Sequence, residues 1–144
     1  MFLRKEKTDF INRITQMQED DKAKFGEMNV NQMVSHCADQ FRMLFGEIEG
    51  LKREKVDLQK MREKIQRNES VQTVEGLDQV AGGGTKPVDF EKDKKTLISY
   101  IDKFSKCEED YKFSFHPFIG EITGEHWERL VIHHLEHHLT QFGR

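Results

Sequence analysis

The sequence lacks the features of a membrane-spanning or secreted chain. Nowhere do about 18 consecutive apolar residues occur, as a bilayer span would need, and the first residues, MFLRKEKTDF, are charged where a signal peptide is apolar. Only two cysteines are present, Cys37 and Cys107, with no CxxC pair, so we expect reduced, structural thiols and no disulfide framework. These absences predict a cytoplasmic protein without a membrane partner.

An excess of basic residues is also missing. The chain has 23 Lys and Arg against 26 Asp and Glu, a net charge of -3, and its pI is near 6.2. Contacts to a phosphate backbone need clustered positive charge. Nucleic acid is therefore excluded as an expected partner.

The sequence offers little that could form a sheet. The segment KFSFHPF alternates, but Pro117, one of only two prolines, interrupts it, and a single strand would have no partner. What the chain does contain is apolar surface: eleven Phe and one Trp occur in 144 residues, although 34% of the residues are charged. We expect residues 1–144 to form one globular domain.

Four segments have the apolar period of an amphipathic helix. The first runs from about residue 8 to residue 24 with Thr8 as its cap. The second begins after Asn29, which has Gln32 at the spacing of a capping box, and weakens at Gly46 and Gly50. The third spans about residues 89–107, and the fourth follows the cap Thr123 to the C-terminus.

A long crossover joins the second and third of these segments, from residue 50 to residue 87. Leu58, Met61 and Ile65 have helical spacing within it, whereas the glycines at 82–84 and Pro87 indicate a loop. Four helices with one long connection predict an all-α four-helix bundle.

Five of the seven histidines fall in the last segment, between His126 and His138. Taking about 100° per residue, His134 and His138 lie in the middle of the apolar stripe that Trp127, Leu130 and Leu135 mark. Their i, i+4 spacing stacks two imidazoles on the inward face, as in helices that supply two metal ligands. His126, His133 and His137 lie on the flank of the stripe instead.

A buried histidine is often a core residue with a hydrogen-bond partner, and this alternative stays open. Two buried rings without partners would cost about 1 to 3 kcal/mol each, whereas one divalent cation would satisfy both. Imidazole pairs suit zinc and nickel. A metal site at His134 and His138 is therefore the preferred interpretation.

His36 is the best candidate for a third ligand, since no other histidine occurs in the first 115 residues. It lies roughly 120° from the centre of its helix's apolar stripe, so it reaches the site only if the last helix packs on that side. His116 could reach the mouth of the site or stabilise a turn. Gln141 could orient a ligand or lie on the surface.

Two other motifs carry less information. The run AGGGTKP has no preceding strand and no following GK[ST], so it does not predict a phosphate-binding loop. Cys37 lies on the apolar stripe of the second helix, about 100° from His36, which indicates a core residue and not a nucleophile.

The segment NVNQMVSHCADQFRML, followed far downstream by HHLEHHLTQF, resembles the DinB/YfiT-like superfamily of metalloenzymes. The segments MNVNQMVSHCAD and HPFIGEITGEHWERLVIHHLEHHLTQFG are most similar to a DUF1569-like subgroup of unknown function. The resemblance covers nearly the whole chain and implies a four-helix bundle with a metal held by His36, His134 and His138. The doubled histidines of HHLEHH allow a second alignment with the family's ligands, in which His133 and His137 would replace His134 and His138. The inward direction of His134 and His138 favours the first alignment.

Some members of the superfamily are S-transferases that use low-molecular-weight thiols, so the resemblance implies a metal-dependent S-transferase or hydrolase with a small-molecule substrate. Three neutral imidazoles would leave open positions on zinc or nickel. The alternatives are a non-catalytic metal- or ligand-binding module and a helical domain whose charged crossover binds a partner. A homodimer is compatible with each of them.

Overall fold

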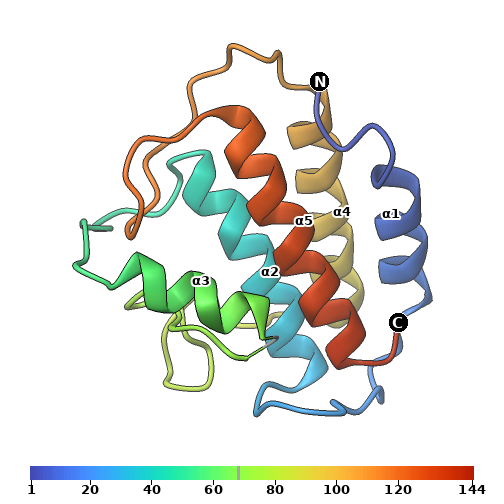
Figure 1. Cartoon of the computed structure of the whole chain (residues 1–144). Helices are drawn as coiled ribbons and strands as arrows, with labels where there is room; N and C mark the ends of the chain where they lie inside the picture. The colour runs from blue at the N-terminus through green and yellow to red at the C-terminus, as the bar shows by residue number, and fades with distance from the viewer. Residues whose placement is uncertain (68) are drawn as a thin grey trace.

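The structure is a computed structural model that describes residues 1–67 and 69–144. The described residues form the helices α1 (Lys7–Gln16), α2 (Val30–Leu44), α3 (Leu58–Gln66), α4 (Phe90–Lys106) and α5 (Gly124–Gln141) (Figure 1). Among these residues there is no strand, only an isolated antiparallel bridge between His116 and Gly120. The predicted all-α class is confirmed.

The two helices that carry the candidate ligands begin where their caps predict. At the start of α2, the Asn29 side chain accepts a hydrogen bond from the Gln32 backbone N–H at 2.8 Å, and the Gln32 side chain accepts one from the Asn29 N–H at 2.9 Å. At the start of α5, Thr123 Oγ1 accepts from the His126 N–H at 3.1 Å. These caps satisfy N–H groups that have no partner inside the helix.

Helix α1 is shorter than its apolar pattern predicts, because it ends at Gln16 and not near residue 24. Thr8 lies inside the helix, whose N-cap is Glu6. After Met17 the sequence QEDDKAK offers the core only one small apolar residue, the partly buried Ala23. The buried Lys94 ammonium donates to the carbonyls of Thr15 at 3.1 Å and Met17 at 2.9 Å, so these carbonyls are satisfied without a further turn.

The four longer helices enclose the hydrophobic core. Helix α2 packs against α4 and α5, and α1 packs against the same two helices. Trp127 of α5 is fully buried and donates its indole N–H to the Ser114 carbonyl at 3.2 Å. Within the described part of the chain, no helix has both the length and the apolar character needed to cross a bilayer.

Helix α3 lies in the crossover between α2 and α4, as the spacing of Leu58, Met61 and Ile65 indicates. It is inclined to the four longer helices (Figure 1), and its residues Met61 and Ile65 line the same cavity as residues of α2 and α5. None of its residues is fully buried. The crossover therefore forms a cover over one side of the α2 and α5 pair, and this is the side on which the histidines lie.

Candidate metal centre

Three histidines from two helices converge between α2 and the crossover. His36 of α2 and His134 and His138 of α5 each offer one ring nitrogen, and these nitrogens all lie within 4.8 Å of one another. The ring centroids are 4.8 Å apart for both pairs that include His36, and 4.6 Å apart for His134 and His138. Helix α5 thus packs against the flank of α2 on which His36 lies, the side that the sequence alone leaves open.

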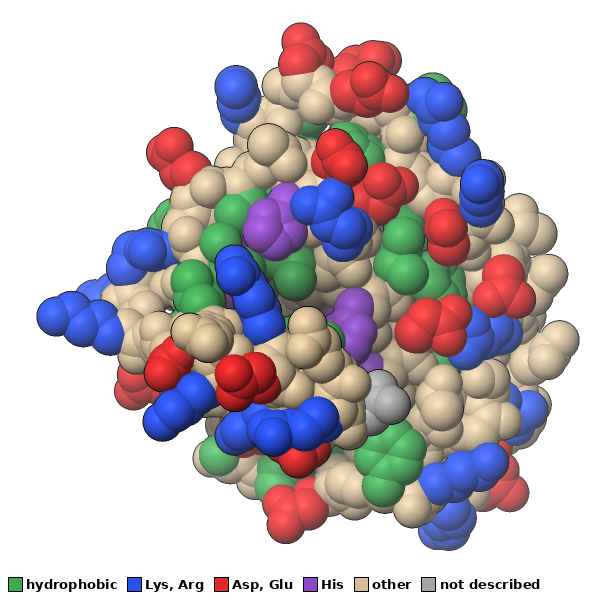
Figure 2. Space-filling model, in the orientation of Figure 1, with side chains coloured by type: hydrophobic (Ala, Val, Ile, Leu, Met, Phe, Trp, Pro, Cys, Tyr) green, Lys and Arg blue, Asp and Glu red, His purple; other side chains and the backbone are tan. Residues whose placement is uncertain are grey.

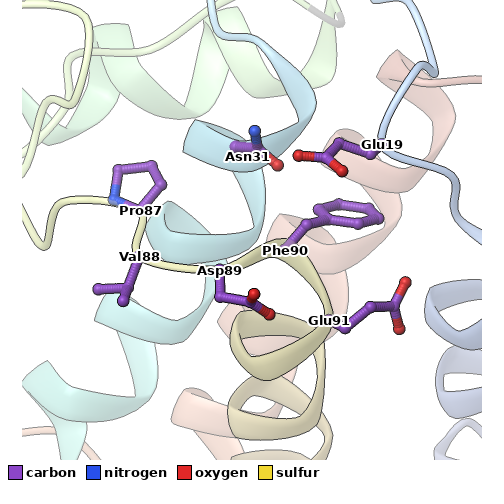
Figure 3. A pocket seen from close by; sticks show the side chains of 7 residues that line it. All are labelled: Glu19, Asn31, Pro87, Val88, Asp89, Phe90 and Glu91. Atoms are coloured by element: carbon purple, nitrogen blue, oxygen red, sulfur yellow. The ribbon is translucent and has the colours of Figure 1, made fainter.

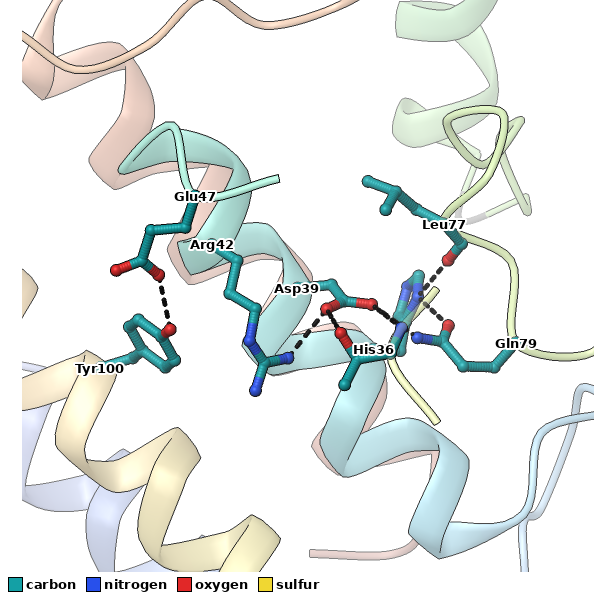
Figure 4. A network of polar contacts seen from close by, with 8 residues as sticks. His36, Asp39, Arg42, Glu47, Leu77, Gln79 and Tyr100 are labelled. Carbon is teal, nitrogen blue, oxygen red and sulfur yellow. Dashed lines mark hydrogen bonds and ion pairs between the residues drawn. The ribbon is translucent and has the colours of Figure 1, made fainter. Parts of the chain in front are cut away.

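The crossover fixes the orientation of the His36 ring. Its Nδ1 lies 3.1 Å from the Gln79 side-chain oxygen and 3.3 Å from the Leu77 carbonyl oxygen (Figure 4). Because the Leu77 carbonyl can only accept, Nδ1 carries the proton and donates. The other nitrogen of His36, Nε2, therefore keeps a free electron pair and faces the histidines of α5.

Gln79 is held in turn by the buried carboxylate of Asp39. Its amide N–H donates to Asp39 at 2.7 Å, which leaves the amide oxygen for His36. Asp39 also accepts from the Thr85 backbone and hydroxyl at 2.9 and 2.6 Å and pairs with Arg42 at 2.8 Å. The carboxylate thus binds the end of the crossover to α2 and positions the His36 imidazole through one amide.

The contact between Asp39 and Gln79 requires a glycine at position 84. Gly84 has a φ of +68°, and a Cβ there would lie 2.3 Å from the Gln79 amide nitrogen and 2.9 Å from an Asp39 oxygen. A side chain would therefore displace the group that orients His36. The sequence analysis did not identify Asp39 or Gln79. The only signals were the glycine run and an acidic residue three positions after a candidate ligand on α2.

His138 is oriented by Gln141, one turn further along α5. Its Nδ1 lies 2.8 Å from the Gln141 side-chain oxygen, and the Gln141 amide donates to the Phe25 carbonyl at 2.8 Å. That second contact shows which end of the Gln141 amide is the nitrogen, so the atom that faces His138 is the oxygen. His138 Nδ1 therefore donates to it, and His138 Nε2 keeps its electron pair. Gly26 permits the approach, since a Cβ there would lie 2.2 Å from the Gln141 nitrogen. The sequence left open whether Gln141 orients a ligand or lies on the surface. In the structure it is buried and contacts the candidate ligand His138.

His134 lacks such a partner. Its Nε2 lies 2.9 Å from His36 Nε2, and its Nδ1 is buried without a hydrogen bond among the described residues. Two metal–nitrogen bonds of about 2.1 Å that meet at a right angle place their nitrogens about 3 Å apart. The spacing of the two Nε2 atoms therefore fits two ligands of one divalent ion.

Burial keeps these imidazoles in the form that binds metals. Burial, reinforced by the neighbouring His138 and His36, holds the pKa of His134 well below its ordinary value. Burial and the nearby His36 lower the pKa of His138 to about 3, against the opposing effect of its hydrogen bond to Gln141. Both rings are therefore neutral near pH 7, and a ligand histidine must be neutral.

A cavity of about 450 Å³ opens above the three histidines and is lined by all of them. Figure 2 shows the hollow with histidine side chains inside it and at its edge. Met61 and Ile65 of α3 line it from the crossover, and Leu130 lines it from α5. Its volume is in the range of sites that bind small organic molecules.

A family model described as "Protein of unknown function (DUF1569)" matches residues 4–144. The chain belongs to this family. No curated protein and no solved structure matches the chain. Because the DUF1569 description gives no activity, the function of this member follows from its site.

Two further histidines of this DUF1569 member, His133 and His137, lie beside the three-histidine cluster. His133 is exposed and His137 is half-buried against Phe25, with ring centroids 5.5 Å apart. Both line the cavity, but within the described residues the cluster of potential ligands has only His36, His134 and His138 as members. The two flanking rings therefore lie at the mouth of the cavity and not at its base.

His116 lines the cavity and also stabilises a turn. Its Nδ1 accepts a hydrogen bond from the Phe118 backbone N–H at 3.0 Å, and its backbone pairs with Gly120 in both directions. Cys37 is buried in the core, and burial raises the pKa of its thiol. Both positions agree with the sequence analysis, which left a turn role for His116 open and assigned Cys37 to the core.

A second cavity of about 300 Å³ does not reach the histidines. Seven residues line it, among them Glu19, Asn31 and Glu91, and Glu19 and Asn31 face one another across it (Figure 3). It shares no lining residue with the larger cavity. We therefore assign it no part in the candidate site.

Replacing Gln79 by leucine is expected to lower the affinity for zinc about tenfold, at the lower end of the effects found for groups that orient a ligand. The loss of affinity is not larger because the Leu77 carbonyl still accepts a hydrogen bond from His36 in this variant. Competition with a chromophoric chelator measures the change. Gln59→Leu is the matched control, because Gln59 is an exposed glutamine of the same crossover that does not line the cavity, and an equal loss in both variants would contradict the assigned role.

The pKa of His116 predicts a loss of stability in acid. Burial, with the nearby charges of His126 and Arg53, lowers this pKa to about 4, below the ordinary value of about 6.5. Between these values the unfolded chain binds more protons, so the free energy of unfolding falls as pH falls from about 6.5 to about 4, by at most about 3 kcal/mol from this group.

Urea unfolding of chelator-treated protein at pH 7 and pH 4 measures this loss. His116→Asn keeps an acceptor for the Phe118 N–H but does not titrate, so its pH dependence should be smaller than that of the wild type. His133→Asn changes an exposed histidine and serves as the control. An unchanged pH dependence in His116→Asn would show that the His116 ring is accessible to protons in the folded state.

Proposed function

We propose that this protein is a metal-dependent enzyme in which His36, His134 and His138 hold one divalent ion, zinc or nickel, for a reaction on a small molecule. One observation carries the proposal. Three imidazoles converge at the base of a cavity, and two of them are oriented through Nδ1 so that Nε2 remains free. The 2.9 Å spacing between His134 Nε2 and His36 Nε2 supports it, because two nitrogen ligands of one ion lie about this far apart.

The number of ligands favours catalysis over a structural ion. Structural zinc sites are closed by four protein ligands, whereas catalytic sites have three and leave a position for solvent or substrate. The cluster within residues 1–67 and 69–144 has three members, and the cavity reaches all three. A small molecule entering the cavity would therefore meet the open side of the ion.

Thiol transfer and hydrolysis are the reaction classes that we propose. A bound divalent ion supplies a Lewis acid that lowers the pKa of a group it binds. The chain's own residues position the site: Gln79 and Gln141 orient two rings, and α3 covers the cavity. The resemblance to DinB/YfiT-like enzymes supports this choice, and we propose that α1, α2, α4 and α5 form their four-helix bundle in one cytoplasmic domain.

One observation favours a non-catalytic metal- or ligand-binding module as the second candidate. Asp39 is the buried carboxylate beside the site, but Arg42, Gln79 and Thr85 occupy its oxygens. It is therefore not free to accept a proton from a substrate. If no other group on the chain accepts that proton, the ion would serve binding or stability alone.

A turnover assay tests the two candidates. Zinc-loaded and nickel-loaded protein is incubated with thiols plus alkyl or epoxide electrophiles, and separately with ester and amide substrates. Turnover that disappears in a His134→Ala, His138→Ala variant is the expected result. Stoichiometric metal in the wild type without turnover in either reaction class would favour the non-catalytic module.

A further inference from the structure

We propose that the cavity above the three histidines accepts an uncharged, mainly apolar small molecule that donates a hydrogen bond to Gln40. The inference rests on the proposed function for the ion but does not depend on the reaction. Three features of the cavity lead to it: the charge of its lining, the apolar residues of its walls and one unpaired oxygen.

The lining carries no cationic side chain of lysine or arginine among the described residues. It includes the acidic residues Glu27, Asp39, Glu69 and Asp78. Basic side chains lie on the surface around the hollow and not at its base (Figure 2). Phosphate, sulfate and carboxylate groups are usually bound by Arg or Lys, and burying such a group unpaired is costly. The cavity therefore disfavours substrates with anionic groups away from the metal.

The walls are apolar and come from several parts of the fold. Met43 lines the cavity from α2, Met61 and Ile65 from α3, Leu77 from the crossover, and Phe118 from the turn before α5. Methionine adapts its shape to a ligand more readily than branched residues do. Apolar groups of a substrate would lose their contact with water here, which is the main favourable contribution to binding small molecules in such cavities.

Gln40 supplies a buried oxygen that has no hydrogen-bond partner in the described structure. It lies one helical turn after His36 on α2 and lines the cavity. The amide N–H of Gln40 donates to the Leu130 carbonyl at 3.5 Å, which places the amide nitrogen on that side. The side-chain oxygen on the other side is buried without a partner. An N–H or O–H group of a ligand next to the ion would satisfy this oxygen.

Hydroxamates are suitable probes, because they bind divalent metals and carry an N–H beside the binding oxygens. We expect zinc-loaded protein to bind benzohydroxamate at least tenfold more tightly than acetohydroxamate in calorimetric titrations, because the ring is buried in the cavity. 4-Carboxybenzohydroxamate, which carries an anionic group on the same ring away from the metal-binding oxygens, should bind more weakly than benzohydroxamate. Tighter binding of the carboxylated probe, or equal binding of benzohydroxamate and acetohydroxamate, would overturn the proposal.

The N–H to Gln40 is tested separately. N-methylation of benzohydroxamate removes the donor and should weaken binding about tenfold to the wild type. In Gln40→Leu the same methylation should cost much less, because no acceptor remains to be lost. An equal penalty in both proteins would show that the donor does not reach Gln40.

A second variant keeps the test decisive if Gln40→Leu folds poorly. Ile65→Lys places a cation in the cavity wall on α3, at a half-buried position outside the core helices. It should improve the binding of 4-carboxybenzohydroxamate and weaken that of benzohydroxamate, and no change in either would contradict the assigned wall. Elemental analysis of each sample separates the two proposals. Absence of zinc would refute the metal site, whereas bound zinc without the expected preference would refute only the ligand class.

Discussion

Untagged protein in which His134 and His138 are both replaced by alanine is expected to lose nearly all of the metal that the wild type binds. The substitutions remove two of the three nitrogens that lie within 4.8 Å of one another. A single imidazole, His36, would remain, and one nitrogen donor does not hold a divalent ion against dilution during purification. Elemental analysis of protein purified without a histidine tag measures the metal content.

The same helix offers a matched control. The His133→Ala, His137→Ala variant makes the same two substitutions at the same spacing, but at an exposed and a half-buried position at the mouth of the cavity. It should keep wild-type metal content. Loss of metal in this control with retention in His134→Ala, His138→Ala would assign the site to the other register. Far-ultraviolet circular dichroism tests whether both variants remain helical.

Sequence reasoning succeeds where a single helix decides the outcome. The capping box at Asn29 and the cap at Thr123 fix the starts of α2 and α5, because these contacts are local. Once the start and period of α5 are known, the inward direction of His134 and His138 follows from the angle between successive residues. The structure places both on the side of α5 that faces α2.

Sequence reasoning is weaker where the outcome depends on how two segments pack. His36 lies off the apolar stripe of α2, and only the position of α5 brings its ring within 2.9 Å of His134. Periodicity within α2 contains no information about that position. The expectation that α1 continues to residue 24 fails for a related reason, since its last carbonyls are satisfied by Lys94, a residue of another helix.

The groups that orient the ligands are still harder to predict. Gln79 is 43 positions from His36 in the sequence and belongs to an irregular segment without periodicity. The contact forms because Asp39 and Gly84 bring that segment against α2. Gln141 shares a helix with His138, but the orientation of its amide is fixed by the carbonyl of Phe25, which lies in the connection between α1 and α2. These contacts form only when distant segments fold together.

Two connections thus contact two of the three histidines. The crossover contacts His36 through Gln79, and the connection between α1 and α2 contacts His138 through Gln141, which also accepts from the Lys24 N–H through its carbonyl at 2.7 Å. An ion that binds only when the three rings converge therefore binds the folded state and not the unfolded chain. Binding of that kind stabilises the fold.

Removing the ion with a chelator is accordingly expected to lower the Tm by about 12 to 16 °C. At a free metal concentration about 1,000 times the Kd, binding to the folded state alone adds about 4 kcal/mol to the free energy of unfolding. For a domain of this length, 1 kcal/mol corresponds to roughly 3 to 4 °C. Thermal unfolding followed by circular dichroism, with excess zinc and with excess chelator, measures the shift.

The shift must depend on the ligand histidines if the ion is bound where we propose. In the His134→Ala, His138→Ala variant the chelator should leave the Tm unchanged, whereas the His133→Ala, His137→Ala variant should respond as the wild type does. A similar fall in all three proteins would be a general effect of the chelator. A wild-type Tm that is insensitive to chelation would show that the folded chain does not hold a tightly bound ion, because any ligand specific for the folded state must raise the free energy of unfolding.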